Sequence, residues 1–95
     1  MDKDMLIKTV VQLIQHELPN NYRVILFGSW AKGNALPASD MDFGIIGEQA
    51  LPWEKYLSIK RQLDSIPTLR SIDLVDMNRV DEHFKKNALA YAQYL

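Results

Sequence analysis

The first eighteen residues carry apolar side chains at the spacing of one helical face. Between residues 5 and 18 these are Met5, Leu6, Val10, Leu13, Ile14 and Leu18. Steps of three, four and seven positions place such side chains on one stripe of an α-helix, which has about 3.6 residues per turn. Pro19 follows and cannot continue the helix. The pattern predicts an amphipathic helix over residues 5–18.

Three later stretches have the pattern of β-strands. Residues 22–27 form an almost continuous run of β-branched, aromatic and aliphatic side chains, which is typical of a central strand covered on both faces. Residues 40–46 and 71–76 place acidic and apolar side chains on opposite faces, because successive strand residues point to opposite sides. Together the three stretches predict a small β-sheet.

Helical patterns separate and follow the predicted strands. A single helical turn is expected at residues 29–32, and a helix is expected over residues 52–66, started by Pro52 and stopped by Pro67. Its expected buried stripe is Trp53, Tyr56, Leu57, Leu63 and Ile66. A last helix, capped by Asn78, is predicted to run to the end of the chain. Its apolar positions are Val80, Phe84, Ala88, Tyr91 and Leu95.

The order α-β-β-α-β-α predicts an α/β fold, in which helices pack on a small mixed sheet within one domain spanning residues 1–95. Eleven basic and twelve acidic residues give a net charge of −1, so no global field attracts nucleic acid and none is expected to bind directly. The absence of cysteine excludes disulfides, thiolate metal sites and cysteine nucleophiles. Without a signal peptide or a long apolar run, a cytoplasmic protein with no membrane contact is expected.

Two aspartates lie one residue apart on the second predicted strand. Asp40 and Asp42 would share a face, with Cα atoms roughly 6.6 Å apart at about 3.3 Å per residue. Like charges on a sheet are costly unless something positive neutralises them, and Mg²⁺ with oxygen ligands is a usual solution. The alternative is an exposed strand edge with both carboxylates in water.

A Gly-Ser pair follows the first predicted strand and precedes the helical turn. Gly28 and Ser29 could cradle a phosphate, with free backbone N–H groups and a hydroxyl donor. The spacing from Gly28 to Gly33 matches part of a P-loop, but the following residues lack the Lys-Ser/Thr pair that a P-loop needs. A simple turn is the alternative interpretation.

The two motifs together resemble a known signature. Residues 28–33 (Gly-Ser-Trp-Ala-Lys-Gly) and 39–43 (Ser-Asp-Met-Asp-Phe) are similar to those of the polymerase-β-type nucleotidyltransferase superfamily. The chain length resembles that of its minimal bacterial members, the MNT proteins. The resemblance implies a polymerase-β-like fold and nucleotidyl transfer from ATP, a reaction supported by two bound Mg²⁺ ions.

The resemblance also implies roles for particular residues. Asp40 and Asp42 would bind both Mg²⁺ ions together with the nucleoside triphosphate. Asp73, on the third predicted strand, would complete the second metal site and orient or deprotonate the acceptor hydroxyl. Gly28 and Ser29 would hold the β- and γ-phosphates. Because three converging carboxylates repel one another, at least one of these aspartates is expected to have a raised pKa in the metal-free protein.

Three assignments remain open at this point. Asp76 competes with Asp73 for the third carboxylate, although an ideal strand turns it to the other face. Trp30 stands where many minimal members carry a basic residue, and could pack on its neighbours or stack on the base. Lys32 could contact the triphosphate or be a solvated surface lysine.

The acceptor must come from elsewhere, because nothing in the chain is left over to select it. Minimal members of the family typically act as antitoxins that transfer AMP from ATP to a tyrosine of a HEPN RNase toxin encoded nearby. Two alternatives are neutralisation by complex formation and modification of a small hydroxylated molecule. Residues 87–95 carry apolar side chains on more than one face, which suits docking of the C-terminal helix onto a partner in a hetero-oligomer.

Overall fold

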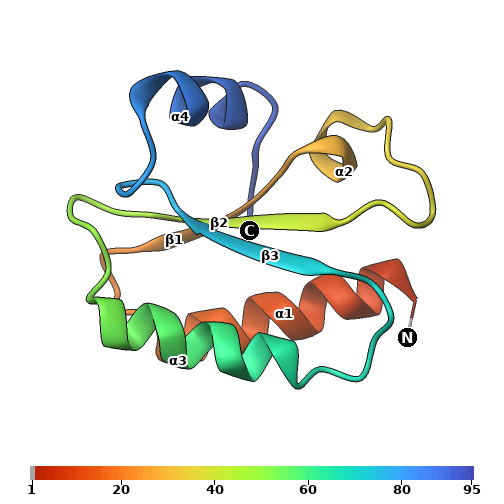
Figure 1. The fold of residues 1–95 in the computed structure, drawn as a ribbon, viewed down its shortest axis with the longest axis horizontal. Helices are drawn as coiled ribbons and strands as arrows, with labels where there is room; N and C mark the ends of the chain where they lie inside the picture. The colour runs from red at the N-terminus through yellow and green to blue at the C-terminus, as the bar shows by residue number, and fades with distance from the viewer. Residues whose placement is uncertain (1) are drawn as a thin grey trace.

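The computed structural model describes residues 2–95 and has four helices and four strands within that part (Figure 1). In chain order the elements are α1 (Lys3–Glu17), β1 (Arg23–Phe27), α2 (Ser29–Lys32), β2 (Met41–Ile46), α3 (Trp53–Asp64), β3 (Ile72–Asp76), α4 (Glu82–Leu89) and β4 (Gln93–Tyr94). The predicted α/β class is confirmed. None of these helices combines the length and the apolar character that crossing a membrane requires.

The sheet has the strand order β3-β2-β1-β4 and is mixed. β2 pairs antiparallel with β1 and parallel with β3, while β4 pairs antiparallel with the other edge of β1. The register aligns Phe27 with Asp42, and Asp42 with Asp73. Asp42 therefore lies between these two residues, one from each neighbouring strand.

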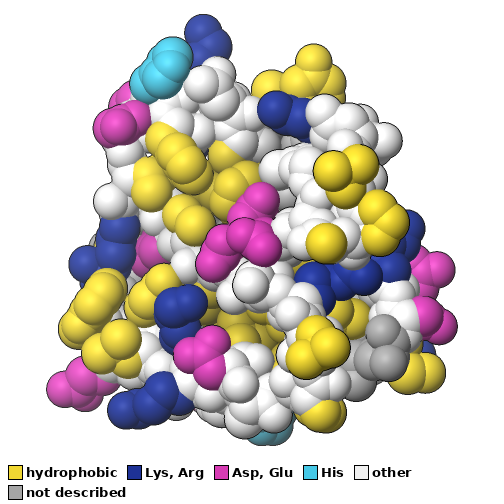
Figure 2. Space-filling view, turned by 45° about the vertical axis from the view of Figure 1, so that its right-hand side comes forward, with side chains coloured by type: hydrophobic (Ala, Val, Ile, Leu, Met, Phe, Trp, Pro, Cys, Tyr) yellow, Lys and Arg dark blue, Asp and Glu magenta, His cyan; other side chains and the backbone are white. Residues whose placement is uncertain are grey.

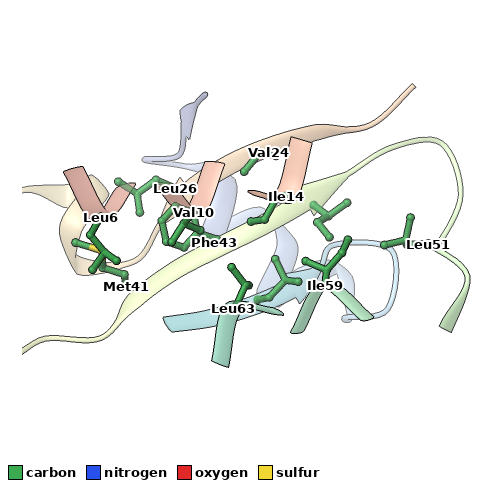
Figure 3. Packing of buried hydrophobic residues seen from close by; sticks show 12 residues of the cluster. Leu6, Val10, Ile14, Val24, Leu26, Met41, Phe43, Leu51, Ile59 and Leu63 are labelled. Atoms are coloured by element: carbon green, nitrogen blue, oxygen red, sulfur yellow. The ribbon is translucent and has the colours of Figure 1, made fainter. Parts of the chain in front are cut away.

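The two faces of the sheet are covered unequally (Figure 1). α1 and α3 cover one face and form the larger core with it, as the close view in Figure 3 shows. The buried residues of this core are Leu6, Val10, Ile14, Val24, Leu26, Met41, Phe43, Ile45, Leu51, Ile59, Leu63 and Leu74. α4 lies over the opposite face, where the buried cluster contains only Ile25, Phe27 and Met77.

Strand alternation decides which side chains reach the thinly covered face. Met41 and Phe43 belong to the larger core, so Asp42 between them points to the opposite face of the sheet. On β3, Leu74 belongs to the larger core, and Asp73 likewise points away from it. The two carboxylates thus share the face that α4 covers only in part.

The helix predicted over residues 5–18 is confirmed as α1. It begins at Lys3, because the side chain of Asp2 accepts a hydrogen bond from the Met5 backbone N–H at 2.8 Å and so caps the helix. At its end, Glu17 accepts hydrogen bonds from Lys55 and Gln62, which fasten α1 to α3.

The predicted stripe of α3 is partly wrong. The structure buries Ile59 and Leu63, whereas Trp53 and Leu57 are exposed. Trp53 stacks on Tyr56, with ring centroids 5.2 Å apart, and so forms part of the surface rather than of the core.

The predicted C-terminal helix is wrong in both bounds. α4 begins after Asp81, whose carboxylate accepts a hydrogen bond from the Phe84 backbone N–H at 2.7 Å, and not after Asn78. Asn78 instead donates its side-chain amide to the carbonyl of Gly47. The chain then leaves the helix and pairs with β1, and the N–H of Leu95 donates to the carbonyl of Val24 at 2.9 Å. Pairing with the edge of β1 satisfies backbone groups that a longer helix would leave open.

Candidate active site

Gly28 fixes the corner between β1 and α2. Its φ of 75° lies in the left-handed region that side chains with a Cβ rarely adopt. A Cβ at this position would also collide with the Asp42 carboxylate, whose Cγ would be only 3.1 Å away. The backbone of Gly28 and the side chain of Asp42 are therefore in direct contact, which joins the two sequence motifs at one place.

The helical turn predicted at residues 29–32 is confirmed as α2. The N–H of Lys32 donates to the carbonyl of Gly28 at 3.0 Å, and the N–H of Gly33 donates to the carbonyl of Ser29 at 3.0 Å. Gly33 ends the turn in the left-handed conformation, with φ 83°. Ser29 is thus the first residue of a helical turn that starts beside Asp42.

The three predicted carboxylates lie near one another but are held differently. Asp42 and Asp73 are register partners on β2 and β3. Asp40 is exposed and lies one residue ahead of β2, not within the strand as predicted. Within residues 2–95, no three acidic or histidine side chains form a ready-made cluster for a metal ion. The structure brings two of the carboxylates together, and their role as metal ligands stays a prediction.

The electrostatics of the site are concentrated on Asp42. Burial raises the pKa of its carboxyl, and the negative charges of Asp73 and Asp40 raise that pKa further. This confirms the expectation of one raised pKa among the three aspartates. Repulsion between carboxylates is the cause that the sequence predicts for the raised pKa, whereas burial of Asp42 is the larger cause in the structure.

Asp76 has a structural role. Its side chain is buried and accepts hydrogen bonds from the backbone N–H groups of Leu51 at 2.7 Å and Asn78 at 2.9 Å. Its Oδ2 also lies 3.7 Å from the Nε of Arg79. A carboxylate engaged in this way is not available to a ligand on the sheet face, which favours Asp73 as the third carboxylate.

Trp30 packs on its neighbours, the first of the two roles considered for it. Its indole Nε1 donates to the carbonyl of Ser39 at 3.0 Å, and its ring packs against the larger core. The cationic groups of Lys3 and Arg70 lie over the ring, 5.6 and 4.7 Å from its centroid. Trp30 thus ties α2 to the segment that leads into Asp40, a link that sequence reasoning missed.

Lys32 lies beside the Gly28 corner and lines the same cavity as Gly28. Its ammonium group is 5.7 Å from the ring centroid of Tyr91, which follows α4. Figure 2 shows acidic side chains gathered in the middle of one face of the molecule, with a hydrophobic hollow next to them. The surface therefore combines negative charge, apolar contact area and nearby cations.

Comparisons with known proteins identify the family of the chain. The family described as polymerase β, nucleotidyltransferase matches residues 8–95. A Haemophilus influenzae protein named as a probable protein adenylyltransferase MntA is 31% identical over 77 residues, which cover 81% of this chain and 68% of that protein.

Solved structures show the same fold at lower identity. A toxin–antitoxin structure with AMP-PNP matches with a TM-score of 0.74 at 20% identity, over 92% of this chain and 69% of that one. A complex of a tri-AMPylated Shewanella oneidensis HEPN toxin with its MNT antitoxin matches with a TM-score of 0.71 at 16% identity, over 96% and 69%. A structure described as a proposed minimal nucleotidyltransferase matches with a TM-score of 0.72 at 23% identity, over 100% and 97%.

The fold, the glycine corner and the paired aspartates define a nucleotidyltransferase of the polymerase-β type, and the chain belongs to that family. Its fold matches that of the MNT antitoxin in a HEPN–MNT complex and that of a proposed minimal nucleotidyltransferase.

Proposed function

We propose that the protein is an adenylyltransferase antitoxin, which transfers AMP from ATP to a tyrosine hydroxyl of a HEPN toxin encoded nearby. The observation that carries this proposal is the pairing of Asp42 with Asp73 directly beside Gly28. The name of the Haemophilus influenzae relative and the AMPylated toxin in the Shewanella oneidensis complex support the choice of reaction and partner.

The donor chemistry of the site fits Mg²⁺. Asp40, Asp42 and Asp73 offer hard carboxylate oxygens, and the raised pKa of Asp42 indicates a place where positive charge is favourable. These three residues would hold the two ions. When bound, the ions supply neutralisation of the triphosphate charge and a lower pKa for the acceptor hydroxyl.

Different residues would bind the acceptor and the leaving group in this transfer of AMP. Asp73 is exposed on β3, away from Gly28, so it can accept a hydrogen bond from the acceptor hydroxyl and take up its proton. The hydroxyl oxygen bonds to the α-phosphorus while the bond from that phosphorus to the pyrophosphate breaks. The backbone of Gly28 and the hydroxyl of Ser29 would hold the departing pyrophosphate, and Lys32, which lines the same cavity as Gly28, would neutralise it.

A second candidate function is neutralisation of the toxin by binding alone. The C-terminal part of the chain exposes three aromatic side chains, Phe84 at 42%, Tyr91 at 62% and Tyr94 at 50%. Exposed aromatic side chains suit a protein–protein contact. A hetero-oligomer formed through α4 and the residues after it remains the expected assembly.

Mass spectrometry of the toxin tests both candidates. The HEPN protein is incubated with Mg²⁺, ATP and wild-type protein, Asp42→Asn, or Asp4→Asn, which changes an exposed aspartate on α1. A gain of AMP with wild type and Asp4→Asn, but not with Asp42→Asn, supports transfer. A stable but unmodified complex supports binding alone. With neither result, modification of a small hydroxylated molecule is the remaining candidate.

A further inference from the structure

Two adjoining depressions lie at the end of the sheet where β2 and β3 begin. The first, of about 280 Å³, extends from the last turn of α3 to Asp73. The second, of about 470 Å³, lies between the loops at residues 33–40 and 65–71. Thr68 and Arg70 line both, so the two form one continuous surface, which we call the Arg70 groove. Along its length it is lined by Asp73, Arg70, Thr68, Leu69, Pro67 and Pro37.

The charge of Arg70 is not matched within residues 2–95. Its guanidinium lies over the Trp30 ring, 4.7 Å from the centroid, which fixes its orientation. Its Nη1 is shielded from solvent without a hydrogen-bond partner, and none of the carboxylates in the described part of the chain forms a salt bridge with it. A buried donor left in this state is costly. Because Arg70 is partly exposed, a carboxylate placed in the groove can pair with the guanidinium.

The remainder of the groove is suited to a polypeptide segment. Lys60 and Asp64 line the part near Asp73, so the charge there is mixed. Arg70 is the only charged residue among those that line the other part. Leu69, at the same part, is fully exposed. A small anion would leave this leucine uncovered, whereas a protein segment can offer both a carboxylate and an apolar side chain.

The position of the groove indicates which substrate it serves. α3 covers the sheet face opposite to Asp42, and the groove lies between α3 and β3, outside the face where the triphosphate is proposed to bind. Asp73, to which the proposed function gives the acceptor hydroxyl, lines the groove. Arg70 and Asp73 are three residues apart, so their Cα atoms are at most about 11 Å apart. One segment of an acceptor protein can therefore contact both.

We propose that the Arg70 groove binds the segment of the acceptor protein that carries the modified hydroxyl, and that Arg70 pairs with an acidic side chain of that segment. The inference rests on the proposed function and adds the chemistry by which the acceptor is selected. Leu69 covers an apolar side chain of the same segment. The groove thus holds the hydroxyl at Asp73, and an acceptor without a nearby carboxylate is bound less well.

Transfer kinetics with separately varied substrates test the proposal. AMP transfer is measured with wild type, Arg70→Met, Arg70→Lys and Leu69→Ala, first at varied concentrations of the HEPN protein and then at varied ATP. Arg70→Met keeps an apolar side chain over Trp30 but removes the charge, whereas Arg70→Lys keeps a charge. Arg61→Met is the matched control, because it removes the charge of an exposed arginine on α3 that does not line the groove. Thermal melts establish that each variant is folded.

We expect Arg70→Met to raise the KM for the HEPN protein roughly 10- to 150-fold, the range that hydrogen bonds to a charged group contribute. The kcat and the KM for ATP should be unchanged. Arg70→Lys should raise the first KM less, Leu69→Ala should raise it about fivefold, and Arg61→Met should leave it unchanged. Added salt should raise this KM more in wild type than in Arg70→Met, because it screens the ion pair.

An equal KM for the HEPN protein in wild type and Arg70→Met overturns the proposal while the proposed function stands. An equal rise in the KM for ATP, or a higher Mg²⁺ requirement, also overturns it, because Arg70 would then act on the nucleotide site through Trp30. Should Arg70→Met not fold, an unchanged KM in both Arg70→Lys and Leu69→Ala overturns it. If wild type transfers no AMP to the HEPN protein, the proposed function fails and the acceptor groove fails with it.

Discussion

Asp42 is the residue on which the chemistry of the site converges. It contacts the Gly28 backbone, pairs with Asp73 and has a carboxyl whose pKa is raised by burial and by the neighbouring charges. A raised pKa means that the folded protein holds its proton more tightly than the unfolded chain does. Stability therefore falls as the pH rises from the ordinary aspartate value, about 3.9, through the folded value of this group, and stays reduced above it.

Asp42→Asn removes that penalty and removes the proposed ligand. We expect the variant to melt at a higher temperature than wild type in EDTA at pH 7, and this difference to vanish below about pH 3.9. We expect transfer of AMP to fall by more than about tenfold, because neutralisation by metal depends on this charge. Melting curves at several pH values and a transfer assay check both statements. A folded variant with nearly normal transfer would contradict the role given to Asp42.

Ser29 offers a smaller test at the same scale. Ser29→Ala should leave the fold intact and weaken use of the triphosphate roughly 10- to 150-fold, since hydrogen bonds to charged groups contribute about 1.5–3 kcal/mol. Steady-state kinetics with varied ATP and a thermal melt measure the two effects separately. A large loss of stability with unchanged nucleotide affinity would instead identify Ser29 as a residue needed only for the start of α2.

At the scale of elements, Trp30 connects α2 to the segment that ends in Asp40. Trp30→Phe keeps an aromatic ring against the core but removes the hydrogen bond to the Ser39 carbonyl. We expect a loss of about 0.5–1.5 kcal/mol in the free energy of unfolding. We also expect transfer to need a higher Mg²⁺ concentration, because Asp40 is less well held. Chemical denaturation and a Mg²⁺ titration of activity measure these changes, and an unchanged Mg²⁺ dependence would limit Trp30 to a packing role.

Two helix caps of the same kind allow the effect of a cap on protein stability to be measured apart from its effect on nucleotide binding. Asp2 and Asp81 each accept a hydrogen bond from a backbone N–H three residues on, in α1 and α4 respectively. Replacing either by alanine should cost about 0.5–2 kcal/mol of stability. Only Asp81→Ala should also change AMP-PNP binding, since Asp81 itself and the α4 residues Phe84 and Asn87 line the cavity beside Gly28. Calorimetric titration of both variants checks this, and equal affinities would mean that neither Asp81 nor the start of α4 contributes to nucleotide binding.

Elements with a sustained pattern were predictable from the sequence, and elements fixed by distant contacts were not. The alternation on residues 71–76 placed Asp73 and Asp76 on their strand, but one partner of Asp76, the backbone N–H of Leu51, comes from a loop 25 residues away. β4 has two residues and exists because the outer edge of β1 is open to it. A two-residue strand has too few positions to show a period of two, so the apolar spacing of the preceding residues predicts a helix that continues to the end of the chain.

For the whole molecule, the two faces of the sheet have different roles. One face is packed against helices and stabilises the fold, and the other carries the candidate site. α1 and α3 hold the sheet from one side with a dense apolar core, while the opposite face is left open enough for carboxylates and a cavity. The sequence motifs predicted the carboxylates and the glycine corner because these residues are close along the chain. The cavity was not predictable, because Phe27 and Phe84 meet only when α4 lies over β1.

The pairing of β2 with β3 has a kinetic consequence. β1 and β2 are close in sequence and pair antiparallel. β2 and β3 are parallel, so the connection between them, which includes α3, must return to the starting edge of the sheet before they can pair. Contacts between distant parts of a chain are costly to close and form late during folding. Asp42 and Asp73 are therefore expected to meet after β1 and β2 have paired. In stopped-flow refolding, competence to bind AMP-PNP should rise with the slowest phase, whereas its appearance with an early helical phase would contradict this order.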